Sequence, residues 1–202
     1  MKKIFLLLFI FFYCQAKAQN ADIELLNRIN PSIPTNFSRD FFKGVSSSSY
    51  MVSIAAPASV FTVSLIKKDK QLRYKAYQMV VGIGLSMSLS LALKYSIDRA
   101  RPYEKYTFIF PHTKEDSPSF PSGHTTAAFE TATSLSLNFP KWYVIVPSYA
   151  WAGAIGYSRM YLGVHYPTDV AAGMLLGAGS AWLTWKINQQ LQKRKVARAV
   201  DQ

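Results

Sequence analysis

The sequence predicts an all-α fold: a membrane helix bundle of about five spans after an N-terminal signal peptide. Half of the 202 residues are hydrophobic and only 17% are charged. The apolar residues gather in five segments of similar length. A helix of about 17 residues rises roughly 25 Å, near the lower limit for crossing a bilayer. Basic residues gather in alternate connections, the charge pattern of a bundle that threads back and forth across a membrane.

Residues 1–18 predict a secretory signal peptide. They begin with two lysines, continue with an apolar run at 4–13 and end with Ala-Lys-Ala, which places small residues at the usual cleavage spacing. If this segment is not removed, it adds a sixth helix, although the run is short for a span. It also holds the only cysteine, Cys14, so the sequence offers neither a disulfide framework nor a cysteine metal site.

Residues 19–49 form an N-terminal periplasmic arm in this interpretation. The segment is mixed and polar, with two prolines and a run of four serines. We expect a short amphipathic helix near 21–29 and then a loop. No pattern of catalytic or metal-binding residues is visible in it, and its role stays open.

The helix-bundle domain is expected at 50–190. Its five apolar segments lie at 50–66, 77–93, 122–139, 142–158 and 170–185. Small residues in the second and last segments allow close packing of helices in a membrane. The third segment contains Glu130, the one acidic residue within an apolar segment. An intramembrane carboxylate is often functional; the alternative is a group bonded to Ser or Thr in the bundle interior.

The connections differ in charge between the two sides of the bundle. The 67–75 connection holds five basic residues against one acidic residue, and a basic cytoplasmic tail is expected at 191–202. On the other side, acidic and basic residues balance in 19–49 and in 95–121. Positive connections mark the cytoplasmic side, so we expect a bacterial inner-membrane protein whose 158–169 connection faces the periplasm. The alternative is a soluble all-α domain exported to the periplasm.

The 158–169 connection concentrates polar groups that helix packing does not need. It contains Arg159, His165 and Asp169 in the pattern Ser-Arg-x5-His-x3-Asp. Pro167 suits the first turn of a new helix, and that turn would direct the Asp169 carboxylate back at the His165 ring. An imidazole held through one nitrogen by a carboxylate keeps its other nitrogen free as a nucleophile. Arg159 adds a planar fork of donors suited to phosphate.

A second pattern precedes it in the chain. Lys94 and Arg101 are seven positions apart, two helical turns along one face. Pro102 tends to end the helix at Arg101, so both cations can converge on one anion. The alternative is a surface salt bridge between Lys94 and Asp98, which are spaced i,i+4.

A third pattern, Pro121-Ser122-Gly123-His124, begins the third apolar segment. A serine hydroxyl, an unobstructed glycine N–H and a helix N-terminus form a cradle for an anion. An ordinary N-cap at Ser122 is the alternative, and both can hold together. His124 follows directly, so its ring would lie beside the bound anion.

Together the three patterns resemble the signature motifs of the type 2 phosphatidic acid phosphatase family, in the family's order over 94–169. That family also includes vanadium haloperoxidases and bacterial class A acid phosphatases. The resemblance implies that His165 takes the phosphoryl group as a phosphohistidine and that Asp169 orients it. It implies that His124 protonates the leaving oxygen and later activates water. The phosphate-binding residues that it implies are Lys94, Arg101, Ser122, Gly123 and Arg159.

The implied activity is metal-independent hydrolysis of a phosphomonoester or pyrophosphate, with a lipid as the substrate and no cofactor. The cations of the motifs would take the place of a divalent ion. Candidate substrates are phosphatidic acid, phosphatidylglycerophosphate, undecaprenyl pyrophosphate and lipid A phosphates. The alternatives are a vanadate-dependent haloperoxidase and a non-catalytic lipid-phosphate binder or carrier. Membrane lipids are the other expected partners. The net charge of +12 comes without a nucleic-acid motif, and the oligomeric state stays open.

Overall fold

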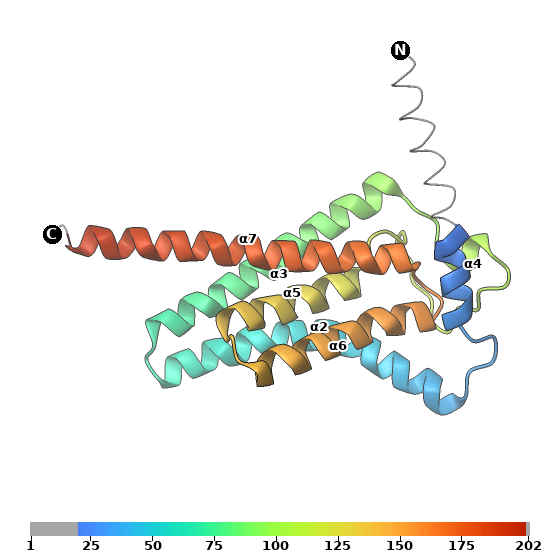
Figure 1. The fold of residues 1–202 in the computed structure, drawn as a ribbon, viewed down its shortest axis with the longest axis horizontal. Helices are drawn as coiled ribbons and strands as arrows, with labels where there is room; N and C mark the ends of the chain where they lie inside the picture. The colour runs from blue at the N-terminus through green and yellow to red at the C-terminus, as the bar shows by residue number, and fades with distance from the viewer. Residues whose placement is uncertain (1–19, 201–202) are drawn as a thin grey trace, which may run out of the picture.

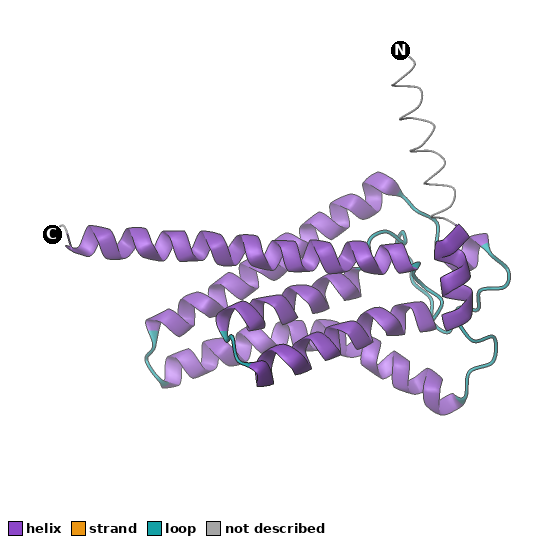
Figure 2. Cartoon of the chain, viewed as in Figure 1, coloured by secondary structure: helices purple, strands orange, loops and turns teal. Residues whose placement is uncertain are grey.

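A computed structural model describes residues 20–200, with side chains described up to residue 194. Every regular element in this range is a helix, which confirms the all-α prediction there (Figure 2). A helical stretch at 20–29 comes first. The helices that follow are α2 (Asn36–Ile66), α3 (Lys70–Ile97), α4 (Pro102–Lys105), α5 (Gly123–Asn138), α6 (Trp142–Tyr161) and α7 (Pro167–Val200). The predicted signal peptide at 1–18 lies outside the described residues.

Local sequence explains where several helices begin and end. Thr35 caps α2 and Asp69 caps α3, and each side chain accepts hydrogen bonds from the first backbone N–H groups of its helix. Helix α3 ends at Ile97, because the next residue, Asp98, adopts a left-handed conformation with φ 47°. The prediction that this helix continues to Arg101 is therefore wrong, and Pro102 instead starts α4. Helix α7 begins with Pro167, whose fixed φ suits the first helical position.

Helix α2 is longer than the sequence indicates. A loop is predicted over 36–49, but α2 begins at Asn36, so this prediction is wrong. Serines in this stretch, which suggested a loop, include side chains that face the bundle interior. The Ser49 hydroxyl, for example, donates a hydrogen bond to the backbone carbonyl of His124 at 2.8 Å. Packing against α5 therefore outweighs the weak helix propensity of serine.

Helix α5 lies at the centre of the bundle and packs against α2, α3, α6 and α7 (Figure 1). Its interior positions include small residues, and Ala127, Ala128 and Ala132 have no exposed surface. Gly177 of α7 allows close approach, because a Cβ atom there would collide with the backbone oxygen of Thr126. The packing of α7 on α5 therefore depends on a small residue, as expected from the glycines of the last apolar segment.

Glu130 lies inside this packed centre with no exposed surface. Its Oε1 atom accepts a hydrogen bond from the Ser134 hydroxyl at 2.8 Å. Gly82 of α3 makes room for the carboxylate, because a Cβ atom at Gly82 would collide with Oε1. Glu130 is thus a buried group bonded to a serine in the bundle interior, one of the two alternatives that the sequence left open.

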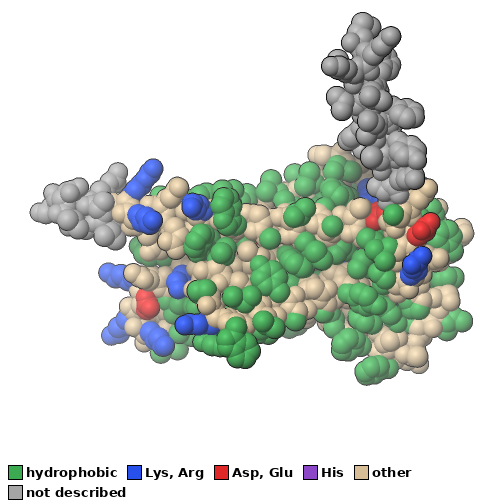
Figure 3. All heavy atoms as spheres, viewed as in Figure 1, with side chains coloured by type: hydrophobic (Ala, Val, Ile, Leu, Met, Phe, Trp, Pro, Cys, Tyr) green, Lys and Arg blue, Asp and Glu red, His purple; other side chains and the backbone are tan. Residues whose placement is uncertain are grey.

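Many hydrophobic side chains are exposed on the outside of the bundle. Figure 3 shows Lys and Arg side chains gathered at the end where α2 meets α3 and where α7 ends, with hydrophobic side chains over the middle. Among the described residues, two helical stretches are long and apolar enough to cross a membrane, Asn36–Ile66 and Lys70–Lys105. Only 22% and 33% of their most apolar windows are buried in the bundle. By this criterion the structure supports two of the predicted spans.

Candidate active site

The three motifs meet at one end of the bundle. Helices α3 and α6 end there and helices α5 and α7 begin there, because successive long helices run in opposite directions (Figure 1). Lys94 lies in the last turn of α3 and Arg159 in the last turn of α6. His124 and Asp169 lie in the first turns of α5 and α7. This end is opposite to the one where surface Lys and Arg side chains gather.

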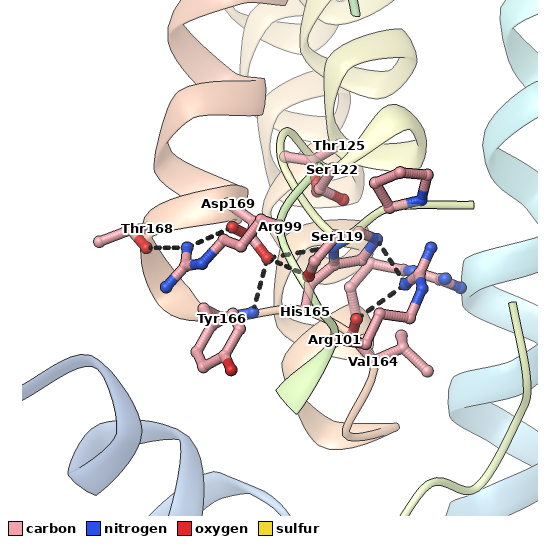
Figure 4. Close-up of polar contacts among 12 residues, drawn as sticks. Arg99, Arg101, Ser119, Ser122, Thr125, Val164, His165, Tyr166, Thr168 and Asp169 are labelled. Atoms are coloured by element: carbon pink, nitrogen blue, oxygen red, sulfur yellow. Dashed lines mark hydrogen bonds and ion pairs between the residues drawn. The ribbon is translucent and has the colours of Figure 1, made fainter. Parts of the chain in front are cut away.

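His165 and Asp169 lie next to each other, as the motif spacing predicts (Figure 4). The Nδ1 atom of His165 is 3.4 Å from Oδ2 of Asp169. The same oxygen accepts hydrogen bonds from the Ser119 hydroxyl at 2.5 Å and from the backbone N–H of Tyr166 at 3.0 Å. His165 is 2% exposed and Asp169 is fully buried, so the pair is shielded from bulk water.

Burial sets the protonation state of this pair. Loss of hydration lowers the pKa of His165 to about 4, and the hydrogen bond to Asp169 offsets this only in part. Burial would raise the pKa of Asp169, but the hydrogen bond from His165 and the charge of Arg99 hold this pKa below its ordinary value. At neutral pH the pair is therefore a neutral imidazole and a carboxylate. With Nδ1–H donated to Asp169, Nε2 carries the free lone pair.

Arg101 lies beside that free nitrogen. Its Nη1 atom is 3.5 Å from Nε2 of His165 and donates a hydrogen bond to the carbonyl of Val164 at 2.8 Å. Its Nε atom donates to the carbonyl of Ser117 at 2.9 Å. The guanidinium is thus fixed by backbone acceptors and is almost fully buried. A cation in this place suits an anion that Nε2 attacks.

Lys94 is also buried, with 8% of its surface exposed. Its ammonium donates a hydrogen bond to the carbonyl of Pro118. Asp98, the partner in the salt-bridge alternative, instead forms the C-cap of α3, and the two side chains make no ion pair. Lys94 therefore has no carboxylate partner among the described residues, and it borders a cavity that Gly123 also lines.

Arg159 is buried between two polar partners. Its Nη1 atom donates a hydrogen bond to Ser46 of α2 at 2.6 Å, and its Nη2 atom forms an ion pair with Glu115. Burial would raise the pKa of Glu115, but the charge and hydrogen bond of Arg159 hold it below its ordinary value. The Nε atom of Arg159 is buried and has no partner among the described residues, so one donor of the guanidinium is unused.

The Pro-Ser-Gly-His stretch places a helix N-terminus at the site. Ser122 occupies the N-cap position of α5, but its hydroxyl pairs with Thr125 Oγ1 at 2.9 Å instead of capping the helix. The backbone at Gly123 is closely covered, because a Cβ atom there would come within 3.1 Å of the Tyr50 hydroxyl. The His124 ring packs against Tyr50, with 4.5 Å between ring centroids.

Two cavities reach the site from different sides. A polar cavity of about 230 Å³ is lined by His124, Arg159, Glu115 and residues of α2 that include Lys43. A more apolar cavity of about 350 Å³ runs between α2 and α3. Its lining residues are Tyr50, Met87, Ser88, Ser90, Leu91, Lys94, Ser117 and Gly123. His124 and Lys94 therefore border open space, whereas His165 lies deeper in the protein.

Arg99, Glu115 and Ser119 are among the residues outside the motifs that contact motif side chains. Arg99 and Ser119 contact Asp169, and Glu115 contacts Arg159. Each of them lies 44 to 70 positions from its partner, so no local spacing identifies it. In the part of the chain that the structure describes, no group of three or more His, Cys, Asp and Glu side chains is placed to hold a metal ion.

Comparisons with known proteins find relatives over much of the chain. An undecaprenyl-diphosphatase from Sulfolobus acidocaldarius is 33% identical over 131 residues, which make up 63% of this chain and 62% of that protein. A lipid A 1-phosphatase from Rhizobium johnstonii is 37% identical over 111 residues, 52% of this chain and 43% of the relative. The chain thus spans less than two thirds of the length of these relatives.

Two solved structures share the fold. LpxE from Aquifex aeolicus aligns with a TM-score of 0.69 and 28% identity, over 82% of this chain and 95% of that one. A transmembrane PAP2 type phosphatidylglycerolphosphate phosphatase from Bacillus subtilis aligns with a TM-score of 0.69 and 26% identity, over 91% of this chain and 94% of that chain. The sequence model of the PAP2 superfamily matches residues 75–193, which contain all three motifs. The chain belongs to the PAP2 superfamily.

Proposed function

We propose that the protein is a membrane phosphatase that hydrolyses a lipid phosphomonoester or pyrophosphate through a phosphohistidine on His165, without a metal ion. The observation that carries this proposal is the position of the free Nε2 atom of His165. It lies 3.5 Å from the Arg101 guanidinium while Nδ1 faces Asp169. A nucleophile held by a carboxylate and set beside buried cations is suited to phosphoryl transfer.

In the first step, Nε2 of His165 attacks phosphorus and the bond from phosphorus to the leaving oxygen breaks. His124, which borders both Tyr50 and open space, gives a proton to that oxygen. The charge on the transferred group spreads over its three equatorial oxygens, which need cations and donors around them. The groups proposed to supply them are Lys94, Arg101, Arg159, the Ser122 hydroxyl and the Gly123 backbone N–H.

In the second step, water attacks the phosphohistidine and gives a proton to His124. The bond from Nε2 to phosphorus breaks, inorganic phosphate leaves, and His165 returns to the neutral form. Asp169 stabilises the imidazolium that exists between the two steps. Glu115 already forms an ion pair with Arg159. An incoming phosphate therefore binds the unpartnered Nε atom of Arg159 or displaces the Glu115 carboxylate.

The space between α2 and α3 supports a lipid substrate. The cavity beside Lys94 opens between these helices. Farther along the same two helices lies a second cavity of about 460 Å³, lined by apolar groups that include Pro57, Phe61 and Val80. An acyl or prenyl chain laid along α2 and α3 would stay in apolar surroundings while its phosphate reaches the site. Similar proteins are named for undecaprenyl diphosphate, lipid A and phosphatidylglycerolphosphate.

The proposed location is the bacterial inner membrane, with the site facing the periplasm. The apolar outer faces of α2 and α3 support a membrane, and the Lys and Arg side chains at the opposite end support a cytoplasmic side there. A signal peptide at 1–18 and a basic cytoplasmic tail at 191–202 are parts of the same proposal.

Phosphate release by purified protein in detergent tests the proposed function. The substrates are a lipid diphosphate, lipid monophosphates and soluble esters, and each is also given to the His165→Ala variant. We expect at least one lipid phosphate to be turned over by the native chain and not by the variant. Binding of lipid phosphate with no release from any substrate contradicts the proposal and favours a binder or carrier.

A further inference from the structure

Arg99 lies between Lys94 and Arg101 but belongs to none of the three motifs. Its Nη1 atom donates hydrogen bonds to Oδ1 of Asp169 at 2.5 Å and to the Thr168 hydroxyl at 2.8 Å. The guanidinium stacks on the Tyr166 ring, 3.8 Å from the centroid. Figure 4 shows this fork reaching Asp169 from the side away from His165. The position of the Arg99 guanidinium is thus fixed by hydrogen bonds in its plane and by the stacking contact on its face.

The two oxygens of Asp169 have separate partners. Oδ2 accepts hydrogen bonds from the His165 ring, the Ser119 hydroxyl and the Tyr166 N–H. Among the described residues, the one hydrogen-bond partner of Oδ1 is Arg99. Without Arg99, a fully buried carboxylate would keep one oxygen without a hydrogen bond. It could then rotate and exchange its oxygens. The 3.4 Å separation from His165 leaves little room for such a change before the contact is lost.

Arg99 is itself held by the N-terminal helical stretch. Its Nη2 atom donates to Oδ2 of Asp22 at 2.8 Å. Asp22 is 4% exposed, and it also accepts the Thr168 N–H at 2.9 Å and the Thr168 hydroxyl at 2.6 Å. A carboxylate at this place caps the first turn of α7, where negative charge is favourable. Asp22 therefore joins the start of α7 to the guanidinium that holds Asp169.

Apolar contacts fix the stretch that carries Asp22. Leu26 has no exposed surface, and it packs with Ile23, Ile109 and Tyr166 in one buried cluster. Tyr166 is the residue on which Arg99 stacks and the one that follows His165 in the chain. The 20–29 stretch thus reaches the site through packing as well as through charge.

We propose that Arg99, held by Asp22, is a positioning residue that keeps the Asp169 carboxylate directed at His165. This inference rests on the proposed function. When His165 accepts the phosphoryl group it becomes an imidazolium, and a correctly placed carboxylate then stabilises it. Among the described residues, no hydrogen bond or ion pair joins the Arg99 side chain to the cradle residues that would bind phosphate. Its loss should therefore slow the formation of the phosphohistidine much more than it weakens the binding of phosphate.

The test measures two quantities on the full chain in detergent. The first is the single-turnover rate of phosphoenzyme formation from p-nitrophenyl phosphate, and the second is the inhibition constant of inorganic phosphate. For Arg99→Ala we expect a rate about 10–100-fold lower, by analogy with the loss of a residue that orients a metal ligand in other active sites. The inhibition constant of phosphate should change less than about threefold. Arg99→Lys should recover part of the rate. Arg39→Ala removes an exposed Arg–Asp pair elsewhere and should change neither quantity.

A double-mutant cycle separates positioning from a merely structural role. If Arg99 acts through Asp169, adding Arg99→Ala to Asp169→Asn should cost little more than Asp169→Asn alone. Asp22→Asn should give a smaller loss of the same kind. If Arg99→Ala does not fold, Arg99→Lys or Asp22→Asn takes its place and is combined with Asp169→Asn in the same way.

Two results would overturn the inference: additive losses in the cycle, or a loss of phosphate affinity as large as the loss of rate. Failure of the proposed function is distinguishable, because the native chain would then form no phosphoenzyme, or His165→Ala would still form it.

Discussion

The Nδ1 atom of His165 lies 3.4 Å from the Oδ2 atom of Asp169, across the single turn that opens α7. Pro167 starts the helix between them, and the backbone N–H of Tyr166 holds the same carboxylate oxygen. Nε2 is therefore the ring nitrogen that does not face the carboxylate, and it lies 3.5 Å from Nη1 of Arg101.

Removal of His165 and removal of His124 should have different effects on activity. His165→Ala removes the atom that accepts the phosphoryl group, so no ester should be turned over well. His124→Ala removes a proton donor, which matters for an alkoxide leaving group and little for a stable phenolate. We expect a loss of about 10²–10⁴-fold on alkyl phosphates and a nearly normal single-turnover burst from p-nitrophenyl phosphate. A burst from the His165 variant alone would reverse the assigned roles.

The rate of phosphoenzyme formation should fall at acidic pH with a midpoint set by the low pKa of His165. Burial lowers this pKa from about 6.5 to about 4, so the reactive neutral form should persist as pH falls and be lost near pH 4. The measurement uses His124→Ala with p-nitrophenyl phosphate, corrected for substrate ionisation, so that the second histidine does not contribute. A midpoint near 6.5 would show that His165 is hydrated in the working protein.

The same shift affects stability. A buried histidine with a lowered pKa binds its proton more readily in the unfolded chain. Its contribution to the free energy of unfolding is therefore fully present above about pH 6.5 and is lost as pH falls toward 4. His165→Gln should flatten this part of the curve of unfolding temperature against pH. An unchanged slope in the variant would assign the acid sensitivity to other groups.

Activity should survive a strong chelator and be inhibited by vanadate. The proposed phosphate site contains three buried cations, Lys94, Arg101 and Arg159, which would stabilise the charge that develops on the phosphoryl group. Vanadate adopts the five-coordinate geometry of phosphoryl transfer and should occupy the same cradle. Phosphate release with EDTA, and with vanadate in the micromolar range, checks both points. Activity that disappears with EDTA and returns with magnesium is the contrary result.

The protein should stay in the membrane fraction after an alkaline carbonate wash. Helices α2 and α3 turn apolar surface outward, including Met51, Ile54 and Val81, and such surface is costly to expose to water. Immunoblotting of pellet and supernatant measures the outcome. Complete release into the supernatant would favour a soluble exported domain.

Two glycines of α7 should differ in their tolerance of alanine. A Cβ atom at Gly177 would collide with the α5 backbone, whereas a Cβ atom at Gly179 meets nothing within 4 Å. Gly177→Ala should cost about 1–3 kcal/mol through overpacking. Gly179→Ala should be neutral or stabilising by up to about 1 kcal/mol. Unfolding temperatures in detergent measure the difference, and equal values for the two variants would show that α7 does not pack on α5 this closely.

Local sequence patterns were enough to predict the helical class and the contact between His165 and Asp169. Pro167 starts α7 two residues after His165, and the first turn of that helix directs the Asp169 carboxylate back at the imidazole. The same reasoning placed a helix N-terminus at Ser122, as the structure has it. It also extended the helix of Lys94 as far as Arg101, which is wrong, because α3 ends at Ile97 and Arg101 precedes α4. These inferences required only local geometry, and the structure places all of these residues at one end of the bundle.

The groups that hold the motif residues in place could be identified only once the packing of the whole chain was known. Arg99 meets Asp22 across 77 positions, and Glu115 meets Arg159 across 44. The helix over 36–49 depends in the same way on α5, which accepts the hydrogen bond of Ser49. Contacts of this kind follow from how whole helices pack against each other, and no local pattern of residues encodes that packing.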